Sequence, residues 1–169
     1  KKYEGASTDI KAAFRVVADH VRSSSLIIAD GGAPANEGRG YVLRKIIRRA
    51  ALFAQKLSDD RTLLPKVSAT FITQMSPIYP ELKKNKELIL TLLQREVDQF
   101  AHNLVHGQAI LQEYIEEKMK PGRRVIDGPE AFKLYDTYGF PPELTNIIAN
   151  EHNFAVDFKG FEAEMEKQR

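Results

Sequence analysis

Basic side chains cluster in one segment of the sequence, directly after a glycine-rich turn. They are Arg39, Arg44, Lys45, Arg48 and Arg49. Helical spacing places the last four on one side of a helix, and the other side carries apolar residues, namely Leu43, Ile46, Ile47, Ala50, Phe53, Ala54 and Leu57. No acidic residue occurs between Arg39 and Lys56, so pairing with a Glu one turn away is impossible. The pattern predicts an exposed basic face that contacts phosphate, although a solvated helix face without a partner has the same pattern.

Catalytic and metal-binding chemistry finds little support in the sequence. His102 and His106 have the i, i+4 spacing of a metal pair, but the intervening Glu of HExxH and a third ligand are missing, so we interpret them as surface histidines. The turn at Gly31-Gly32 lacks both GxxxxGK[ST] and GxGxxG. No nucleophile and base can be assembled into a set. We therefore expect no catalytic residue, no metal and no cofactor in this chain.

Composition sets broad limits. The 169 residues are enough for one ordinary domain or two small ones. The 25 basic and 23 acidic residues nearly cancel, so only the local asymmetry of charge suggests an anionic partner. The absence of cysteine excludes disulfides and thiolate zinc sites. No apolar run approaches the ~20 residues of a membrane span, and the expected location is the cytoplasm. The start without Met suggests a piece of a longer protein.

The spacing of apolar residues predicts a mainly α fold, a helical bundle with one long helix. Pro121-Gly122 is the expected boundary between a subdomain of residues 1–120, which contains the basic helix, and a smaller helical subdomain of residues 121–169 with a short β-ribbon. Helices are expected at 10–28, 36–57, 63–72, 87–119, 128–138, 142–148 and from 159, and extended segments at 124–126 and 154–157.

One carboxylate occupies an unfavourable position in this scheme. Asp136 falls in the last turn of the helix that Gly139 closes, where the helix dipole disfavours negative charge by a few tenths of a kcal/mol. A local backbone contact or exposure to water would explain it, and so would a partner that donates hydrogen bonds.

Four blocks of the sequence, in the same order, closely resemble alanyl-tRNA synthetase. They are residues 15–22, 29–31, 38–50 and 134–141. The resemblance covers nearly the whole chain and falls on the tRNA-recognition region between the class II catalytic domain and the editing domain. It implies two helical subdomains that hold the acceptor stem of tRNA(Ala). It also implies that the parent protein is an ATP-dependent alanine-tRNA ligase, with ATP and Mg in the catalytic domain and zinc in the editing domain, and that this region binds without catalysing.

The resemblance further implies roles for particular residues. Asn36 and Asp136 match the family's two residues that read a G·U wobble pair in the acceptor stem. The guanine 2-amino group of such a pair lacks its Watson-Crick partner, and acceptor-stem RNA exposes it in a wide minor groove. A carboxylate can only accept a hydrogen bond, whereas an Asn amide can both donate and accept. The basic face would supply contacts to phosphates. Lys45 stands where the family commonly has Arg, so a bidentate contact there is lost.

A shared base pair would require the part after Pro121 to fold back toward the basic helix. The alternative function, from a different class, is a helical protein-interaction scaffold whose basic face binds an acidic protein.

Overall fold

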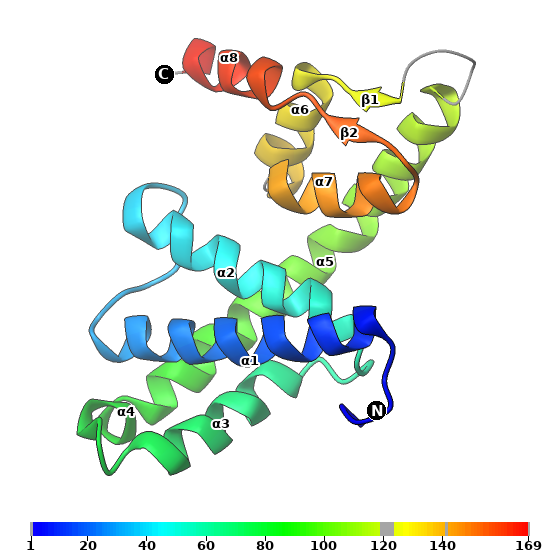
Figure 1. The fold of residues 1–169 in the computed structure, drawn as a ribbon. Helices are drawn as coiled ribbons and strands as arrows, with labels where there is room; N and C mark the ends of the chain where they lie inside the picture. The colour runs from blue at the N-terminus through cyan, green and yellow to red at the C-terminus, as the bar shows by residue number, and fades with distance from the viewer. Residues whose placement is uncertain (1, 119–123, 141, 169) are drawn as a thin grey trace. The chain divides into compact units, whose positions relative to one another are not determined.

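The computed structural model describes residues 2–118, 124–140 and 142–168. These residues form a mainly helical structure (Figure 1), which confirms the fold class expected from the sequence. The chain divides into two compact units, Lys1–Phe100 and Ala101–Arg169. This division lies within a long helix rather than after residue 120, where the sequence analysis set its boundary. Pro121 and Gly122, on which that boundary rested, lie outside the described residues.

The first unit contains four helices and the beginning of a fifth. Helix α1 packs against both α2 and α3, and α4 is a single short turn of helix that the sequence analysis missed. Pro80 starts α4, a position where a missing N–H costs no hydrogen bond. The elements are α1 (Thr8–Ala29), α2 (Gly38–Gln55), α3 (Leu63–Met75), α4 (Pro80–Lys84) and α5 (Lys86–Lys118).

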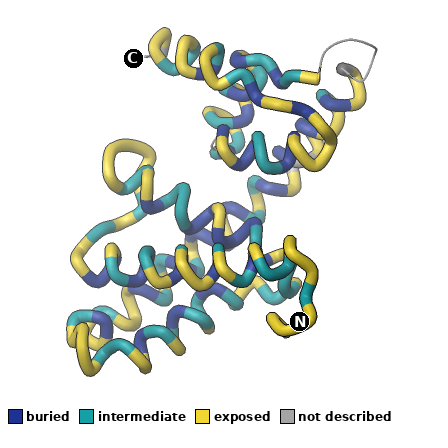
Figure 2. Tube along the Cα trace, in the orientation of Figure 1, coloured by how far each residue is buried: buried dark blue, intermediate teal, exposed yellow. Residues whose placement is uncertain are grey.

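The core of this unit is formed by the apolar faces of its helices. Figure 2 shows the buried residues in dark blue. Spacing of three and four residues brings the apolar side chains of each helix to one face. A buried polar contact crosses the core, since the hydroxyls of Ser25 and Ser68 lie 2.8 Å apart and join α1 to α3. The main buried residues are Ala13, Val17, Val21, Ile28, Leu43, Ile47, Ala50, Leu64, Ile72, Ile89 and Leu93.

Helix α5 follows the predicted long helix closely. Its apolar positions Ile89, Leu93, Val97, Phe100, Leu104, Leu111 and Ile115 are all buried. Gly107, which the sequence analysis considered a possible bend, has a different reason to be glycine. A Cβ at this position would lie 2.5 Å from the ring of Phe140, so glycine makes room for that side chain. In the described part of the chain, every helix is too short or too polar to cross a membrane.

In its described residues, the second unit contains the rest of α5, three further helices and two short strands. Strand β1 (Val125–Ile126) pairs with β2 (Ala155–Val156) in parallel, with Val125 opposite Ala155. Parallel strands need a long crossover connection, and α6 (Gly128–Tyr138) with α7 (Pro142–Glu151) supplies it. The two extended segments expected from the sequence are therefore confirmed as strands. Helix α8 (Phe158–Gln168) follows β2 and packs on α6.

Candidate nucleic-acid interface

The basic residues of α2 do not share one exposed face. Arg48 is 4% exposed, and the side chain of Arg44 is 18% exposed. Arg39 and Arg49 are exposed, and Lys45 is half-buried. The expectation that Arg48 lies on an exposed face is wrong, because this side chain lies in the core of the first unit.

A buried carboxylate explains why Arg48 is tolerated there. Glu96 of α5 accepts a hydrogen bond from Arg48 Nε at 2.8 Å, and Arg44 Nε lies 3.1 Å from the same oxygen, Oε1. The Arg48 guanidinium also lies 5.5 Å from the centre of the Phe100 ring. Burial lowers the pKa of Arg48 from its ordinary value, and Glu96 opposes this shift. A buried cation needs such a partner, since an unpaired charge would cost several kcal/mol.

Sequence reasoning missed Glu96 because it searched for a partner one helical turn away. The partner lies 48 residues from Arg48 in the sequence and on another helix. One signal was present, because Glu96 falls between Leu93 and Phe100 at the spacing of the apolar stripe. A charged residue within such a stripe indicates a buried charge that needs a partner.

Cations that are exposed or half-buried along α2 and at its C-cap lie beside aromatic rings. Lys45 Nζ lies 5.1 Å from the ring centre of Tyr41, and Arg49 Cζ lies 5.8 Å from that of Phe53. Lys56 Nζ lies 5.6 Å from the same Phe53 ring. Basic side chains next to aromatic rings suit a nucleic-acid strand, because basic side chains bind its phosphates and aromatic rings stack on its bases.

Asn36 lies in the loop between α1 and α2, and it is exposed. The loop lies close to the first turn of α2, because a Cβ at Gly40 would lie only 2.5 Å from the carbonyl oxygen of Ala33. Glycine at position 40 is therefore needed for this approach. The side-chain oxygen of Asn36 accepts a hydrogen bond from Nη1 of Arg44. The candidate recognition residue is thus fixed to the helix that follows it.

Asp136 lies in the last turn of α6, as the sequence predicts, and it is exposed. The end of this helix is well defined. Gly139 adopts the left-handed conformation with φ of 64°, and its N–H donates to Tyr135 O while the N–H of Phe140 donates to Leu134 O. This is the Schellman arrangement, and Phe140 next to it is fully buried. Asp136 therefore projects from a firmly anchored helix end.

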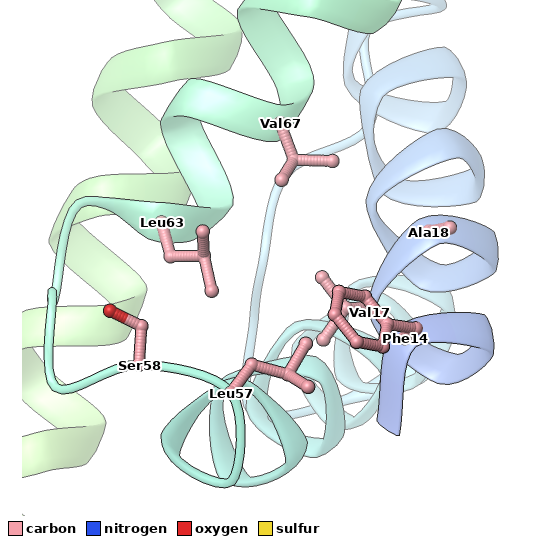
Figure 3. Close-up of a pocket in the computed structure, with 7 residues that line it drawn as sticks. All are labelled: Phe14, Val17, Ala18, Leu57, Ser58, Leu63 and Val67. Atoms are coloured by element: carbon pink, nitrogen blue, oxygen red, sulfur yellow. The ribbon is translucent and has the colours of Figure 1, made fainter. Parts of the chain in front are cut away.

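A small pocket in the first unit does not suit an anion. It has a volume of about 250 Å³ and lies between α1, α3 and the end of α2 (Figure 3). Its lining is apolar except for Ser58. The sequence placed His102 and His106 one helical turn apart, but the side chain of His106 lies outside the described part of the structure. Within that part, no three His, Asp or Glu side chains converge as metal ligands.

Comparison with known proteins decides the family. The model of the family described as tRNA synthetases class II (A) matches residues 1–169, the whole chain. The chain belongs to this family.

Individual relatives of this class II tRNA synthetase chain share one name. The alanine–tRNA ligase of Bdellovibrio bacteriovorus is 45% identical over 164 residues, which are 97% of this chain and 18% of that protein. That of Bacillus velezensis is 45% identical over 157 residues, 93% of this chain and 18% of the relative. That of Bacillus cytotoxicus is 43% identical over 169 residues, 100% of this chain and 19% of the relative. The chain thus spans about a fifth of the length of these synthetases.

Proposed function

We propose that this chain is the tRNA-recognition region of an alanine–tRNA ligase, located between its catalytic and editing domains. It would hold the acceptor stem of tRNA(Ala) and read a G·U wobble pair there. The observation that carries this proposal is the set of basic side chains along α2, with Arg39 and Arg49 exposed and Lys45 half-buried, together with the exposed Asn36, in a chain of the synthetase family. The relatives of this chain bear the name alanine–tRNA ligase, which supports tRNA(Ala) as the partner.

The proposed roles are of two kinds, contacts with the phosphate backbone and contacts with the bases. Arg39, Lys45 and Arg49 would contact phosphates, which fixes the position of the stem without reading its sequence. Asn36 and Asp136 would contact the edge of the wobble pair, which a wide and shallow minor groove exposes in RNA helices. Arg48 has no direct part in this proposal, because its guanidinium is buried against Glu96.

The chemistry of the whole enzyme would belong to other parts of the parent protein. In this proposal the ATP and Mg²⁺ needed to attach alanine bind to the catalytic domain, and zinc binds to the editing domain. The proposal assigns neither group to this chain. The two domains would then be this chain's partners within one polypeptide.

The test is a titration of this chain with acceptor-stem minihelices that carry either G·U or G·C at the recognised position. The wild-type chain should bind the G·U stem more tightly. Asn36→Ala and Asp136→Ala should each weaken the G·U complex by about 1–3 kcal/mol and change the G·C complex little. Phosphate contacts persist in both variants, so general affinity should remain.

Matched controls come from exposed residues of the same types. Asn150→Ala and Glu162→Ala remove an exposed amide and an exposed carboxylate that the proposal does not use, and they should leave both affinities unchanged. Equal affinity of the wild-type chain for both stems would refute recognition of the wobble pair. Binding that does not weaken with added salt would refute the phosphate contacts and would favour the protein-interaction scaffold.

A further inference from the structure

Arg44 connects the candidate recognition residue to a buried carboxylate. Its Nη1 donates a hydrogen bond to Oδ1 of Asn36, and its Nε lies 3.1 Å from Oε1 of Glu96. The Glu96 side chain is only 5% exposed, whereas Asn36 is on the surface. The guanidinium therefore links an anchor in the core of the first unit to a side chain that can contact a ligand.

The chemistry of arginine fixes the orientation of the Asn36 amide. A guanidinium carries five N–H donors and no acceptor, so the Asn36 atom that faces it must be the carbonyl oxygen. The amide group is planar, and its NH₂ therefore points in another direction from the contact with Arg44. In this arrangement Asn36 offers a ligand two donors, and one of the two lone pairs of its oxygen is already used.

We infer that Arg44, anchored by Glu96, is a positioning residue that presents the NH₂ of Asn36 as a hydrogen-bond donor to the RNA. The inference rests on the proposed function and assigns a chemical role within it. Asn36 would then bind an acceptor on the partner base of the wobble pair, such as uracil O2, rather than the guanine 2-amino group. The 2-amino group is left to an acceptor, a role that suits the Asp136 carboxylate.

This role replaces the phosphate contact that the sequence suggested for Arg44. Its Nη1 donates to Asn36, its Nε lies 3.1 Å from the Glu96 carboxylate, and its side chain is 18% exposed. Arg49, five residues further along the same helix, is exposed and has no such link to Asn36. Arg44 and Arg49 should therefore differ in kind, since one would affect the choice of base pair and the other the general affinity.

A double-mutant cycle tests the inference. The variants are Arg44→Met, which keeps an unbranched side chain without donors, Asn36→Ala, and the two combined. Each is titrated with the G·U and the G·C minihelix. Arg44→Met should lower the ratio of G·U to G·C affinity about tenfold, the size expected for one misplaced hydrogen bond to a base. In the Asn36→Ala background the same change should leave the ratio unaltered, because Arg44 acts through Asn36.

Two further variants sharpen the result. Arg49→Met is the matched control on the same helix, and it should weaken both stems alike while preserving their ratio. Glu96→Gln removes the anchoring charge and should lower the ratio in the same direction as Arg44→Met. Because Glu96 also binds the buried Arg48, the thermal unfolding of Glu96→Gln is measured to check that this variant is folded. If it is unfolded, the double-mutant cycle of Arg44 and Asn36 alone decides the question.

The outcomes separate this inference from the proposed function. A wild-type chain that binds both stems equally refutes the proposed function, and the positioning role with it. A wild-type preference for G·U combined with additive effects of Arg44→Met and Asn36→Ala overturns the positioning role alone. Equal weakening of both stems by Arg44→Met does the same, since it indicates a phosphate contact. The NMR resonances of the Asn36 side-chain amide, recorded without RNA, should shift in Arg44→Met and stay in place in Arg49→Met.

Discussion

Arg48 and Arg49 are neighbours in α2, but their surroundings are opposite. Arg48 is buried, donates to Glu96 and lies over the Phe100 ring. Arg49 is exposed and lies beside the ring of Phe53. One step along a helix turns the side chain by about 100°, which is enough to move it from the core to the surface. Two identical residues therefore serve stability in one case and, in our proposal, RNA binding in the other.

The difference shows why a run of basic residues cannot be treated as a single surface. Net charge along the sequence counts Arg44 and Arg48 with Arg39 and Arg49. In the structure, the first two share one carboxylate on α5, and the charge available to a ligand comes from the others. A buried cation can be predicted from the sequence only when its acidic partner can be identified, and here the partner lies 48 residues further along the chain.

The largest effect is expected from removal of the shared carboxylate. Glu96→Ala leaves Arg48 buried and Arg44 largely buried without a counter-charge, so the free energy of unfolding should fall by about 3–5 kcal/mol. Urea denaturation monitored by circular dichroism measures this change.

Arg49→Ala is the control for that experiment, and it should change the free energy of unfolding by less than about 0.5 kcal/mol. The combined variant Arg48→Met with Glu96→Met should be more stable than Glu96→Ala, because it removes both buried charges of the closest pair. Equal stability of Glu96→Ala and the wild-type chain would contradict the buried ion pair.

A smaller effect distinguishes the two arginines in RNA binding. Arg49→Ala should weaken binding of every acceptor stem and reduce the slope of log affinity against log salt by about one unit, since one phosphate contact is lost. Arg48→Met should leave the slope unchanged, because Arg48 does not reach solvent. The measurement is a fluorescence titration at several salt concentrations. A reduced slope in Arg48→Met would show that the RNA draws this side chain out of the core.

Much of the fold could be predicted from the sequence because its cues are local. Apolar residues three and four apart defined α5, and the Asp127 to Gly139 segment carried its own start and stop signals. In the structure the Asp127 side chain accepts from the N–H of Glu130, and Gly139 ends α6. Contacts between distant segments were not predictable. Gly107 is the clearest case, because its reason is the Phe140 ring and nothing near it in the sequence shows that.

The candidate site shows the same limit. The location of Asp136 in a last helical turn could be predicted from Gly139, which ends the helix. The contact of Asn36 with Arg44 depends on how the loop before α2 folds against this helix, and that of Arg44 with Glu96 depends on how α2 lies against α5. Helical spacing assigns residues to a face, but it does not show which part of a face another helix will cover.

The smallest effect concerns an exposed ion pair, which is the natural counterpart of the buried one. The Asp60 carboxylate accepts from Lys66 Nζ at 2.7 Å and from both the N–H and the hydroxyl of Thr62. The hydrogen bond from Lys66, followed by those from Thr62, lowers the pKa of Asp60 from 3.8 to about 2. A carboxylate with a lowered pKa in the folded state stabilises the fold above the unfolded pKa, and this contribution is lost as the pH falls from about 4 to about 2.

The comparison of wild-type and Asp60→Asn chains measures this contribution. The wild-type chain should have the higher Tm at pH 6, and the difference should shrink toward zero as the pH falls below about 4. Added salt at pH 6 should shrink it as well, because exposed charges are screened. The cost of Glu96→Ala should respond much less to salt, since its charges are buried. If salt affected both variants equally, the distinction between the buried and the exposed ion pair would not hold.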